Sequence, residues 1–311
     1  MLAIVNVIAP IFALMALGYF AVRLRAFPAE GIRGLIAFVN NFATPCLLFY
    51  SLINSDLVSA FNIAIIAPYY IGAIICFVAG ILLAVKLFGN RPGEAVSAGF
   101  SAMFTNTVLI GLPIIQRAYG AEALPVTLSI IGLHGAILLT LAMLTMEFMR
   151  RDGQSLGKTM AVALRRVGSN PLIWGIAAGM IGYFSGLELI EPADAFFLMM
   201  MQAVVPVALF GIGGALNEYR LSDSWRQAVV ASVLKLILHP LIAYVLMVPV
   251  LGVPIEIARY GILLSAMPPG VNIYVFATYY NRGVSVAANT ILIATLASAV
   301  TVSVWLYILG A

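Results

Sequence analysis

The sequence Ser101-Ala-Met-Phe-Thr-Asn-Thr-Val-Leu-Ile-Gly-Leu-Pro113 lies in the middle of an uncharged run that extends from Ala95 to Gln116. Such a run is long enough to cross a bilayer as one helix. Its centre holds residues that weaken a helix or offer polar atoms: Thr105, Asn106, Thr107, Gly111 and Pro113. In hydrocarbon each freed backbone group needs a partner. The stretch therefore predicts either a helix broken at the membrane midplane, as in transporters, or a proline-kinked packing helix.

The composition places the whole chain in a membrane. Hydrophobic residues make up 63% and charged residues 9% of the 311 residues, and the mean hydropathy is +1.08. A soluble domain has about a quarter charged residues. The net charge of +4 comes from basic loop residues, so it indicates membrane orientation and not nucleic-acid binding. Cys46 and Cys76 lie in apolar runs and predict neither a disulfide framework nor a metal site.

Apolar runs between charge clusters predict an all-α polytopic protein with ten transmembrane helices. The predicted spans are 3–22, 34–54, 61–85, 95–116, 124–146, 168–187, 195–217, 226–249, 259–280 and 284–309. The odd-numbered loops hold thirteen basic residues, whereas the even-numbered loops hold two, Arg117 and Arg259. The positive-inside rule therefore predicts that the odd-numbered loops are cytoplasmic and that both termini lie outside.

Three internal similarities indicate that the chain is a repeat. Pro10-Ile-Phe-Ala-Leu-Met-Ala-Leu-Gly18 resembles Pro171-Leu-Ile-Trp-Gly-Ile-Ala-Ala-Gly179, and Asn41-Phe-Ala-Thr-Pro-Cys-Leu-Leu-Phe49 resembles Gln202-Ala-Val-Val-Pro-Val-Ala-Leu-Phe210, both 161 residues later. Ser101-Ala-Met103 recurs as Ser265-Ala-Met267, 164 residues later. The order predicts a five-helix repeat in 1–149, a cytoplasmic connecting loop at 150–166 and an inverted five-helix repeat in 167–311, with broken helices 4 and 9 in equivalent positions.

Three motifs resemble those of the auxin efflux carrier family. Phe104-Thr-Asn-Thr-Val-Leu-Ile-Gly-Leu-Pro113 is similar to the family's fourth-helix motif, and Met267-Pro-Pro-Gly-Val-Asn-Ile-Tyr-Val-Phe-Ala277 to its ninth-helix motif. Asn41-Phe-Ala-Thr-Pro45 matches the second span, and the resemblance covers all ten spans. It implies a bile-acid-symporter-like fold, with a scaffold domain from spans 1, 2, 6 and 7 and a transport domain, holding the crossed broken helices, from spans 3–5 and 8–10. The chain lacks the long hydrophilic loop of the plant carriers, which favours the short bacterial type.

The crossing of the two broken helices is the predicted substrate site. If they unwind near 105–108 and 268–271, half-helix N-termini near Val108 and Val271 direct free N–H groups and positive dipole ends inward, where a carboxylate binds. Spans 2 and 7, with Pro45 and Pro206, line the same cavity or flex during transport, and the alternative, favoured for Pro206, is that these prolines are static kinks. The predicted substrate-binding residues are Asn41, Thr44, Thr105, Asn106, Thr107, Gly270, Val271 and Asn272, and the predicted helix-breaking residues are Pro45, Gly111, Pro113, Pro206, Pro268 and Pro269.

Ionisable residues inside the spans are the other candidates. Lys235 lies near the midplane of span 8, with His239 one helical turn later. Three roles are open for Lys235: it attracts an anionic substrate, it takes part in a proton relay, or its side chain extends toward the cytoplasmic end of its helix. His134, in the middle of span 5, is a packed hydrogen-bonded residue or a proton carrier. Gly175, Gly179 and Gly182 favour close helix packing.

These observations predict a secondary carrier, or a potential-driven uniporter, for a small organic anion. The family resemblance implies a mono- or dicarboxylate such as malonate or malate, or an auxin-like acid, moved by alternating access in the bacterial inner membrane. No catalytic motif, metal site or cofactor is expected, and H⁺ and Na⁺ both stay open as coupling ions. A homodimer is the oligomeric state that we consider for this protein. The alternatives are a sodium-coupled bile-acid-type symporter of a larger amphipathic anion and a non-transporting membrane sensor.

Overall fold

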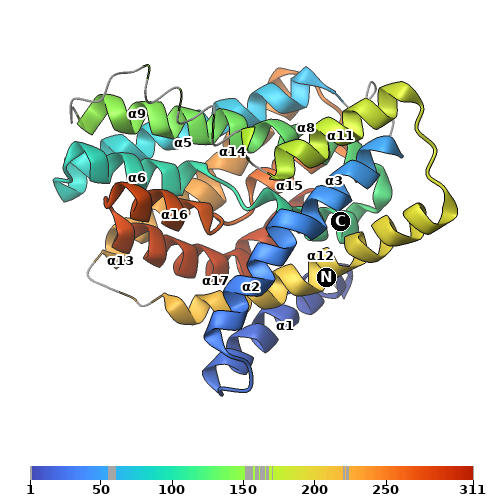
Figure 1. Ribbon diagram of the computed structural model, residues 1–311. Coiled ribbons are helices and arrows are strands. Elements are labelled where there is room, and N and C mark those ends of the chain that lie inside the picture. The colour runs from blue at the N-terminus through green and yellow to red at the C-terminus, as the bar shows by residue number, and fades with distance from the viewer. Residues whose placement is uncertain are drawn as a thin grey trace.

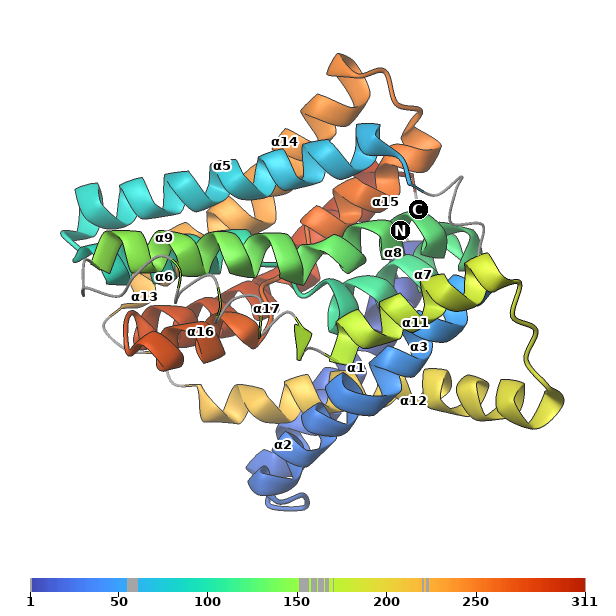
Figure 2. The ribbon, with the colours of Figure 1, turned by 45° about the horizontal axis from the view of Figure 1, so that its top comes forward.

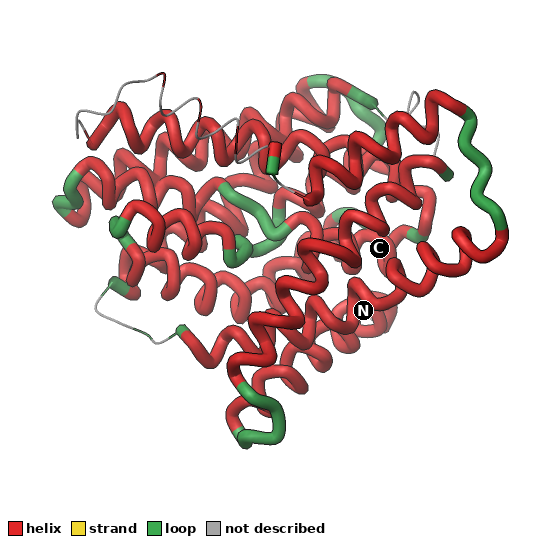
Figure 3. The backbone as a smooth tube through the Cα atoms, in the orientation of Figure 1, coloured by secondary structure: helices red, strands yellow, loops and turns green. Residues whose placement is uncertain are grey.

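The computed structural model describes residues 2–54, 61–150, 157, 161, 165, 168–169, 171–219, 221 and 224–310. Within these ranges the regular structure is helical, and no strand is found (Figure 3). The predicted connecting loop 150–166 lies almost entirely outside the described residues.

Eight segments of the described chain are long and apolar enough to cross a membrane. They are Ile4–Arg23, Ala29–Ile53, Ile63–Phe88, Pro92–Tyr119, Ala121–Met149, Glu191–Glu218, Trp225–Val250 and Val284–Ile308. Two of the ten predicted spans are not among them. The apolar helix in 168–187 has only 15 residues, and the segment predicted at 259–280 consists of two short helices separated by 266–271.

The N-terminal part of the chain, up to Arg150, contains the first five of these segments. Its elements are α1 (Leu2–Arg23), α2 (Ala29–Phe38), η1 (Val39–Ala43), α3 (Thr44–Ile53), α5 (Ile63–Phe88), α6 (Pro92–Met103), η2 (Thr107–Gly111), α7 (Leu112–Tyr119), η3 (Ala121–Ala123), α8 (Leu124–His134), η4 (Gly135–Leu139) and α9 (Thr140–Arg150). Local caps set the ends of the long helix α5. The Asn62 side chain accepts a hydrogen bond from the Ala64 N–H, and Gly89 ends the helix in the left-handed conformation.

The C-terminal part continues with further helices and ends close to the N-terminus (Figures 1 and 2). Its elements are α11 (Pro171–Ser185), α12 (Glu191–Ala215), η5 (Leu216–Glu218), α13 (Trp225–Val233), η6 (Leu234–Leu238), α14 (His239–Val245), η7 (Leu246–Val250), α15 (Ile255–Ser265), α16 (Asn272–Tyr280) and α17 (Val284–Ile308).

Small residues allow the helices to pack closely. Helix α1 packs along α12 and α3 packs along α11. A Cβ atom on Gly175 would lie 2.6 Å from the Pro45 carbonyl oxygen, and Gly179 and Gly182 face Leu52 and Ile53 of α3 in the same way. The prediction that these three glycines serve close packing is therefore confirmed.

The segment Pro92–Tyr119 lies at the centre of the molecule. About 94% of its most apolar stretch is buried, compared with 28–44% in the other seven candidate spans. Large apolar side chains such as Phe20, Trp174 and Leu296 are exposed on the outer helices. An exterior of this kind suits a lipid environment, and the central segment is thus shielded from it.

Three prolines follow wider turns in helices that are not broken. Pro45, Pro113 and Pro240 each lie two residues after a π-helical turn, namely η1, η2 and η6. A proline lacks an N–H and its ring clashes with the carbonyl four residues earlier, so a wider turn relieves the contact. The carbonyl facing Pro240 belongs to Leu236, and it accepts a hydrogen bond from the Trp305 indole at 3.3 Å.

Four predicted helix-breaking residues therefore need correction. Pro45 and Pro113 lie in the first turns of α3 and α7, which continue directly from π-helical turns. Gly111 is the last residue of η2, where a Cβ would lie 2.6 Å from the end of the Leu264 side chain, so it serves packing. Pro206 lies inside α12, which runs without interruption through it. A single missing N–H does not end a long helix held by its neighbours.

Candidate functional site

The central segment is interrupted at residues 104–106, just after the end of α6. Phe104 caps α6 in an extended conformation, and η2 begins at Thr107. The sequence predicted unwinding near 105–108 with the second half starting near Val108, so the break lies about one residue earlier. The polar cluster marks the break well, because Asn106 caps the helix that follows it.

Asn106 holds the first break through both its backbone and its side chain. Its Oδ1 accepts a hydrogen bond from the Leu109 N–H at 3.2 Å, and its carbonyl oxygen accepts one from the Gly111 N–H at 3.0 Å. Its own N–H donates to the Pro268 carbonyl at 2.9 Å. The side chain is 7% exposed. Asn106 therefore satisfies the backbone that the break has freed.

The second interruption covers residues 266–271, between α15 and α16. Pro268, Pro269 and Gly270 lie within it, as predicted, and all three are buried. A Cβ on Gly270 would lie 3.3 Å from the Asn106 side-chain carbon Cγ, so glycine allows the two broken segments to approach. Together with the bond between Asn106 and Pro268, this contact joins the two breaks at one place in the interior, visible as loop segments in Figure 3.

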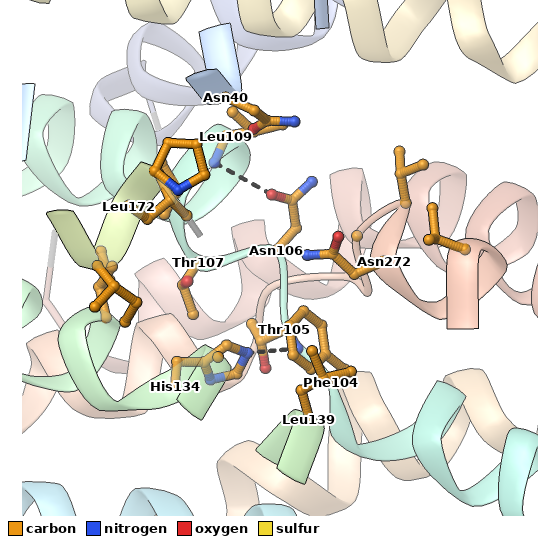
Figure 4. A pocket seen from close by; sticks show the side chains of 18 of the residues that line it. Asn40, Phe104, Thr105, Asn106, Thr107, Leu109, His134, Leu139, Leu172 and Asn272 are labelled. Carbon is orange, nitrogen blue, oxygen red and sulfur yellow. Dashed lines mark hydrogen bonds between the residues drawn. The ribbon is translucent and has the colours of Figure 1, made fainter. Parts of the chain in front are cut away.

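An open cavity of about 350 Å³ lies against this junction. Its polar side chains come from η1, the first break, α8 and the start of α16 (Figure 4). Its apolar wall comes mainly from α2, α8, η4, α11 and α16. The polar lining residues are Asn40, Asn41, Thr105, Asn106, Thr107, His134 and Asn272, and the apolar ones include Ile36, Phe104, Ile131, Leu139, Leu172, Ile176, Val275 and Phe276.

Seven of the eight predicted substrate-binding residues line this cavity. They are Asn41, Thr105, Asn106, Thr107, Gly270, Val271 and Asn272. Thr44 does not line it and is fully buried, with a hydroxyl that has no hydrogen-bond partner. The π-helical turn η1 explains the difference, because residues three apart no longer share one face when a turn is widened. Asn40, a polar residue of span 2 that is not among the eight predicted substrate-binding residues, also lines the cavity.

The cavity can attract an anion through backbone groups. No charged side chain lines it. Four residues that line it, Thr107, Val108, Val271 and Asn272, have backbone N–H groups without a hydrogen-bond partner among the described residues. Thr107 and Val108 begin η2, and Val271 and Asn272 begin α16. Unpaired N–H groups at the starts of helical segments carry a partial positive charge, so they can bind a carboxylate.

Behind the cavity, buried polar side chains connect the two breaks. His134, which lines the cavity, accepts a hydrogen bond at Nε2 from the Thr105 N–H at 3.2 Å. A backbone N–H can only donate, so the proton of the neutral ring lies on Nδ1, 3.2 Å from the Tyr69 hydroxyl. His134 is therefore bonded on both nitrogens and supports the backbone of the first break.

On the side of the second break, Lys235 and His239 are both fully buried. The Lys235 ammonium donates to the Ser265 carbonyl at 2.5 Å and contacts His239 Nδ1 at 3.0 Å. His239 Nε2 lies 3.0 Å from the Tyr69 carbonyl. Neither residue lines the cavity. The alternative in which Lys235 extends toward the cytoplasmic end of its helix is thus wrong. Lys235 also does not reach the cavity in which a substrate would bind.

The described residues contain no group of three or more His, Cys, Asp or Glu side chains that could hold a metal ion. Cys46 and Cys76 are both free thiols.

The chain is similar to known membrane transport proteins over nearly its full length. A family model described as "Membrane transport protein" matches residues 3–306. A protein of Rhizobium meliloti (strain 1021) named "Putative malonate transporter" is 30% identical, and the match covers 99% of this chain and 97% of that protein.

More distant relatives extend to plants. "Uncharacterized transporter YfdV" of Escherichia coli (strain K12) is 23% identical, over 96% of this chain and 95% of its own. "Auxin efflux carrier component 8" of Arabidopsis thaliana is 24% identical, over 89% of each chain. The similarity thus runs the length of the molecule and includes both breaks.

Proposed function

This chain belongs to the auxin efflux carrier family of membrane transport proteins, and from that premise we propose that it carries a small organic anion across a bacterial inner membrane. The family consists of membrane transporters and not of enzymes. The substrate proposed is a mono- or dicarboxylate such as malonate or malate, or an auxin-like acid. The name of the Rhizobium relative supports the malonate class.

One observation carries the proposal. Two interrupted segments meet at a cavity where four backbone N–H groups lack a partner and no charged side chain is present. Substrate sites between discontinuous helices are a feature of secondary transporters. We assign carboxylate binding to the N–H groups of Thr107, Val108, Val271 and Asn272, with the Asn272 side chain as a further donor. The apolar wall then receives the remainder of the substrate.

The proposed architecture is that of two inverted five-helix repeats with ten crossings. It counts α11 and the interrupted pair α15 and α16 as crossings in addition to the eight long segments. The packing of α1 and α2 on α12, and of α3 on α11, supports a scaffold built from spans 1, 2, 6 and 7. Contacts of α5 with α6 and of α13 with α17 support a separate transport domain. Alternating access is the motion of one domain against the other.

The proposed sidedness, with odd-numbered loops in the cytoplasm and both termini outside, rests on the distribution of basic residues, and two ion pairs support only the grouping of the loops into two sets. Arg33 and Glu218, both near loops proposed to be cytoplasmic, lie 3.2 Å apart. Arg259 and Glu122, both near loops proposed to be outside, lie 3.9 Å apart. Each pair joins residues that the topology puts on one side. A homodimer stays a prediction.

Uptake by purified protein in liposomes tests the proposal. Radiolabelled malonate, malate and indole-3-acetate are offered with and without imposed gradients of pH, Na⁺ and voltage. We expect saturable, protein-dependent uptake of at least one of these acids, with competition by the other acids that fit the cavity. Asn6→Ala, at an exposed position outside the cavity, serves as the matched control for the asparagine variants. Absence of uptake of every carboxylate by well-folded protein would refute the assignment.

A further inference from the structure

Lys235 lies in an unusual position for a cation, fully enclosed and next to the end of a half-helix. It belongs to the π-helical turn η6, which packs against α5, α6 and α17. Its Nζ donates a hydrogen bond to the carbonyl oxygen of Ser265, the last residue of α15. A charge inside the membrane region is costly and needs compensation. The charge of Lys235 therefore needs compensation by the groups around its ammonium.

The Ser265 carbonyl is an acceptor that the second break leaves open. The last carbonyls of a helix have no partner in that helix, and together they carry the negative end of its dipole. No backbone N–H donates to the Ser265 oxygen among the described residues. The ammonium thus occupies the negative end of α15, on the opposite side of the break from the N–H groups that face the cavity.

The second partner of the ammonium is also a neutral acceptor. His239 Nε2 lies next to the Tyr69 carbonyl, which can only accept, so this nitrogen carries the proton. His239 Nδ1 therefore presents its lone pair to Lys235 at 3.0 Å. Within the described part of the chain, no carboxylate forms an ion pair with Lys235. Two neutral acceptors and a helix end hold the cation.

The Ser265 carbonyl, at the end of a half-helix, is of the kind that holds a coupling cation in secondary transporters, where carbonyls of unwound backbone and C-terminal ends of half-helices coordinate Na⁺. We propose that the Lys235 ammonium is a resident cation at the C-terminal end of α15, which takes the place of a coupling metal ion. The carrier then needs no Na⁺ to neutralise the negative end of α15 at the second break during transport. This consequence for coupling rests on the proposed transport function, but the cation site itself does not.

Thermal stability in detergent tests the site without any substrate. The wild-type midpoint Tm is measured in NaCl, choline chloride and tetramethylammonium chloride at equal ionic strength, and we expect equal values. In Lys235→Ala we expect Tm to fall by at least about 4 °C, because the half-helix end loses its charge. NaCl or methylammonium chloride then restores at least half of the loss, and the larger tetramethylammonium does not. Lys86→Met, at an exposed position near the end of α5, is the matched control and keeps the wild-type values.

The proposal is overturned if Na⁺ specifically raises the wild-type Tm. It is also overturned if Lys235→Ala keeps the wild-type Tm, or if none of the small cations restores stability to that variant. Lys235→Met, which keeps most of the side-chain volume, separates loss of charge from loss of packing and should show the same fall in Tm.

Transport by the wild-type protein gives a second readout that needs no variant to fold. Replacing Na⁺ by N-methylglucamine on both sides should leave the uptake rate of the best carboxylate unchanged. A tenfold fall would overturn the proposal. If no carboxylate is transported, the proposed function fails, whereas the Tm comparison still decides the role of Lys235.

Discussion

The two breaks at the centre of the molecule are held in different ways. The first covers three residues and is held mainly from within its own segment, by Asn106 bonded to Leu109 and Gly111. The second covers six residues and has backbone hydrogen bonds of its own only near its ends, such as those from Met267 to Leu264 and from Ile273 to Gly270. Further support comes from other segments, from Lys235 at the Ser265 carbonyl and from Asn106 at the Pro268 carbonyl. Asn272, which begins α16, has no side-chain hydrogen bond among the described residues and is exposed to the cavity.

Asn106 and Asn272, in corresponding places of the two breaks, therefore have different roles. Asn106 is a structural cap that also borders the cavity, whereas Asn272 is free to contact a substrate. Substitutions at the two positions should therefore differ in what they do to stability and to transport.

Ranked by the loss of transport, Asn106→Ala should have the largest effect. Loss of the Oδ1 cap leaves the Leu109 N–H unsatisfied and should lower stability by about 1–2 kcal/mol, and the crossing loses its geometry, so uptake should fall below detection. Tm in detergent and liposome uptake measure the two effects. Asn106→Asp keeps the acceptor but adds a negative charge beside the cavity, so it should retain more of the Tm and still fail to transport. An Asn106→Ala protein with wild-type Tm would show that the cap is not needed.

His134→Ala should have the next largest effect, because it leaves the buried Thr105 N–H without an acceptor. An unsatisfied buried donor costs about 1–3 kcal/mol. We expect a lower Tm and a clear loss of uptake. His134→Gln offers a replacement acceptor and should recover part of both. Equal behaviour of the alanine and glutamine variants would argue that His134 only fills space.

Asn272→Ala should reduce transport without reducing stability. Its side chain supplies no bond to the protein, so Tm should stay within about 1 °C of wild type, a shift below that expected for 1 kcal/mol. The apparent KM for the best carboxylate should rise about tenfold, the effect of losing about 1.4 kcal/mol of binding. A fall in Tm like that of Asn106→Ala would remove the distinction between the two asparagines.

Thr44→Val should have the smallest effect on transport. Thr44 is fully buried, does not line the cavity and has an unpaired hydroxyl. Valine has a similar shape without the polar atom, so Tm should stay equal or rise slightly. Uptake kinetics should not change. A raised KM would place Thr44 back among the substrate contacts.

The sequence predicted the class, the two breaks and most of the cavity, because each has a local cause. Thr105, Asn106, Pro268 and Gly270 either disfavour a helix or supply polar atoms, and this is readable without any knowledge of packing. The network of Lys235, His239, Tyr69 and His134 could not be predicted in the same way. It needs four side chains from three separate segments to meet, and Tyr69 looks in sequence like any apolar helix residue.

The errors at Thr44, Pro45 and Pro113 have one source. Proline was expected to end or kink a helix, and the sequence offered no sign that the turn before it would widen instead. Once that turn is π-helical, the faces of residues on its two sides no longer follow α-helical spacing. Asn40 and Asn41 therefore face the cavity while Thr44 is packed inside.

The widened turns also change how these helices tolerate changes in length. A π-helical turn closes with one more residue than an α-helical turn, and η4 is followed by α9, which contains no proline, so deleting one residue from 135–139 can restore an α-helical turn and leave α9 in place. The same deletion inside α17, which has regular α-helical geometry from Val284 to Ile308, rotates everything beyond it by about 100° and moves it by about 1.5 Å. Because Gly135 and Leu139 of η4 line the cavity, the length of the chain can be adjusted beside the cavity with less disturbance to the surrounding bundle than inside α17.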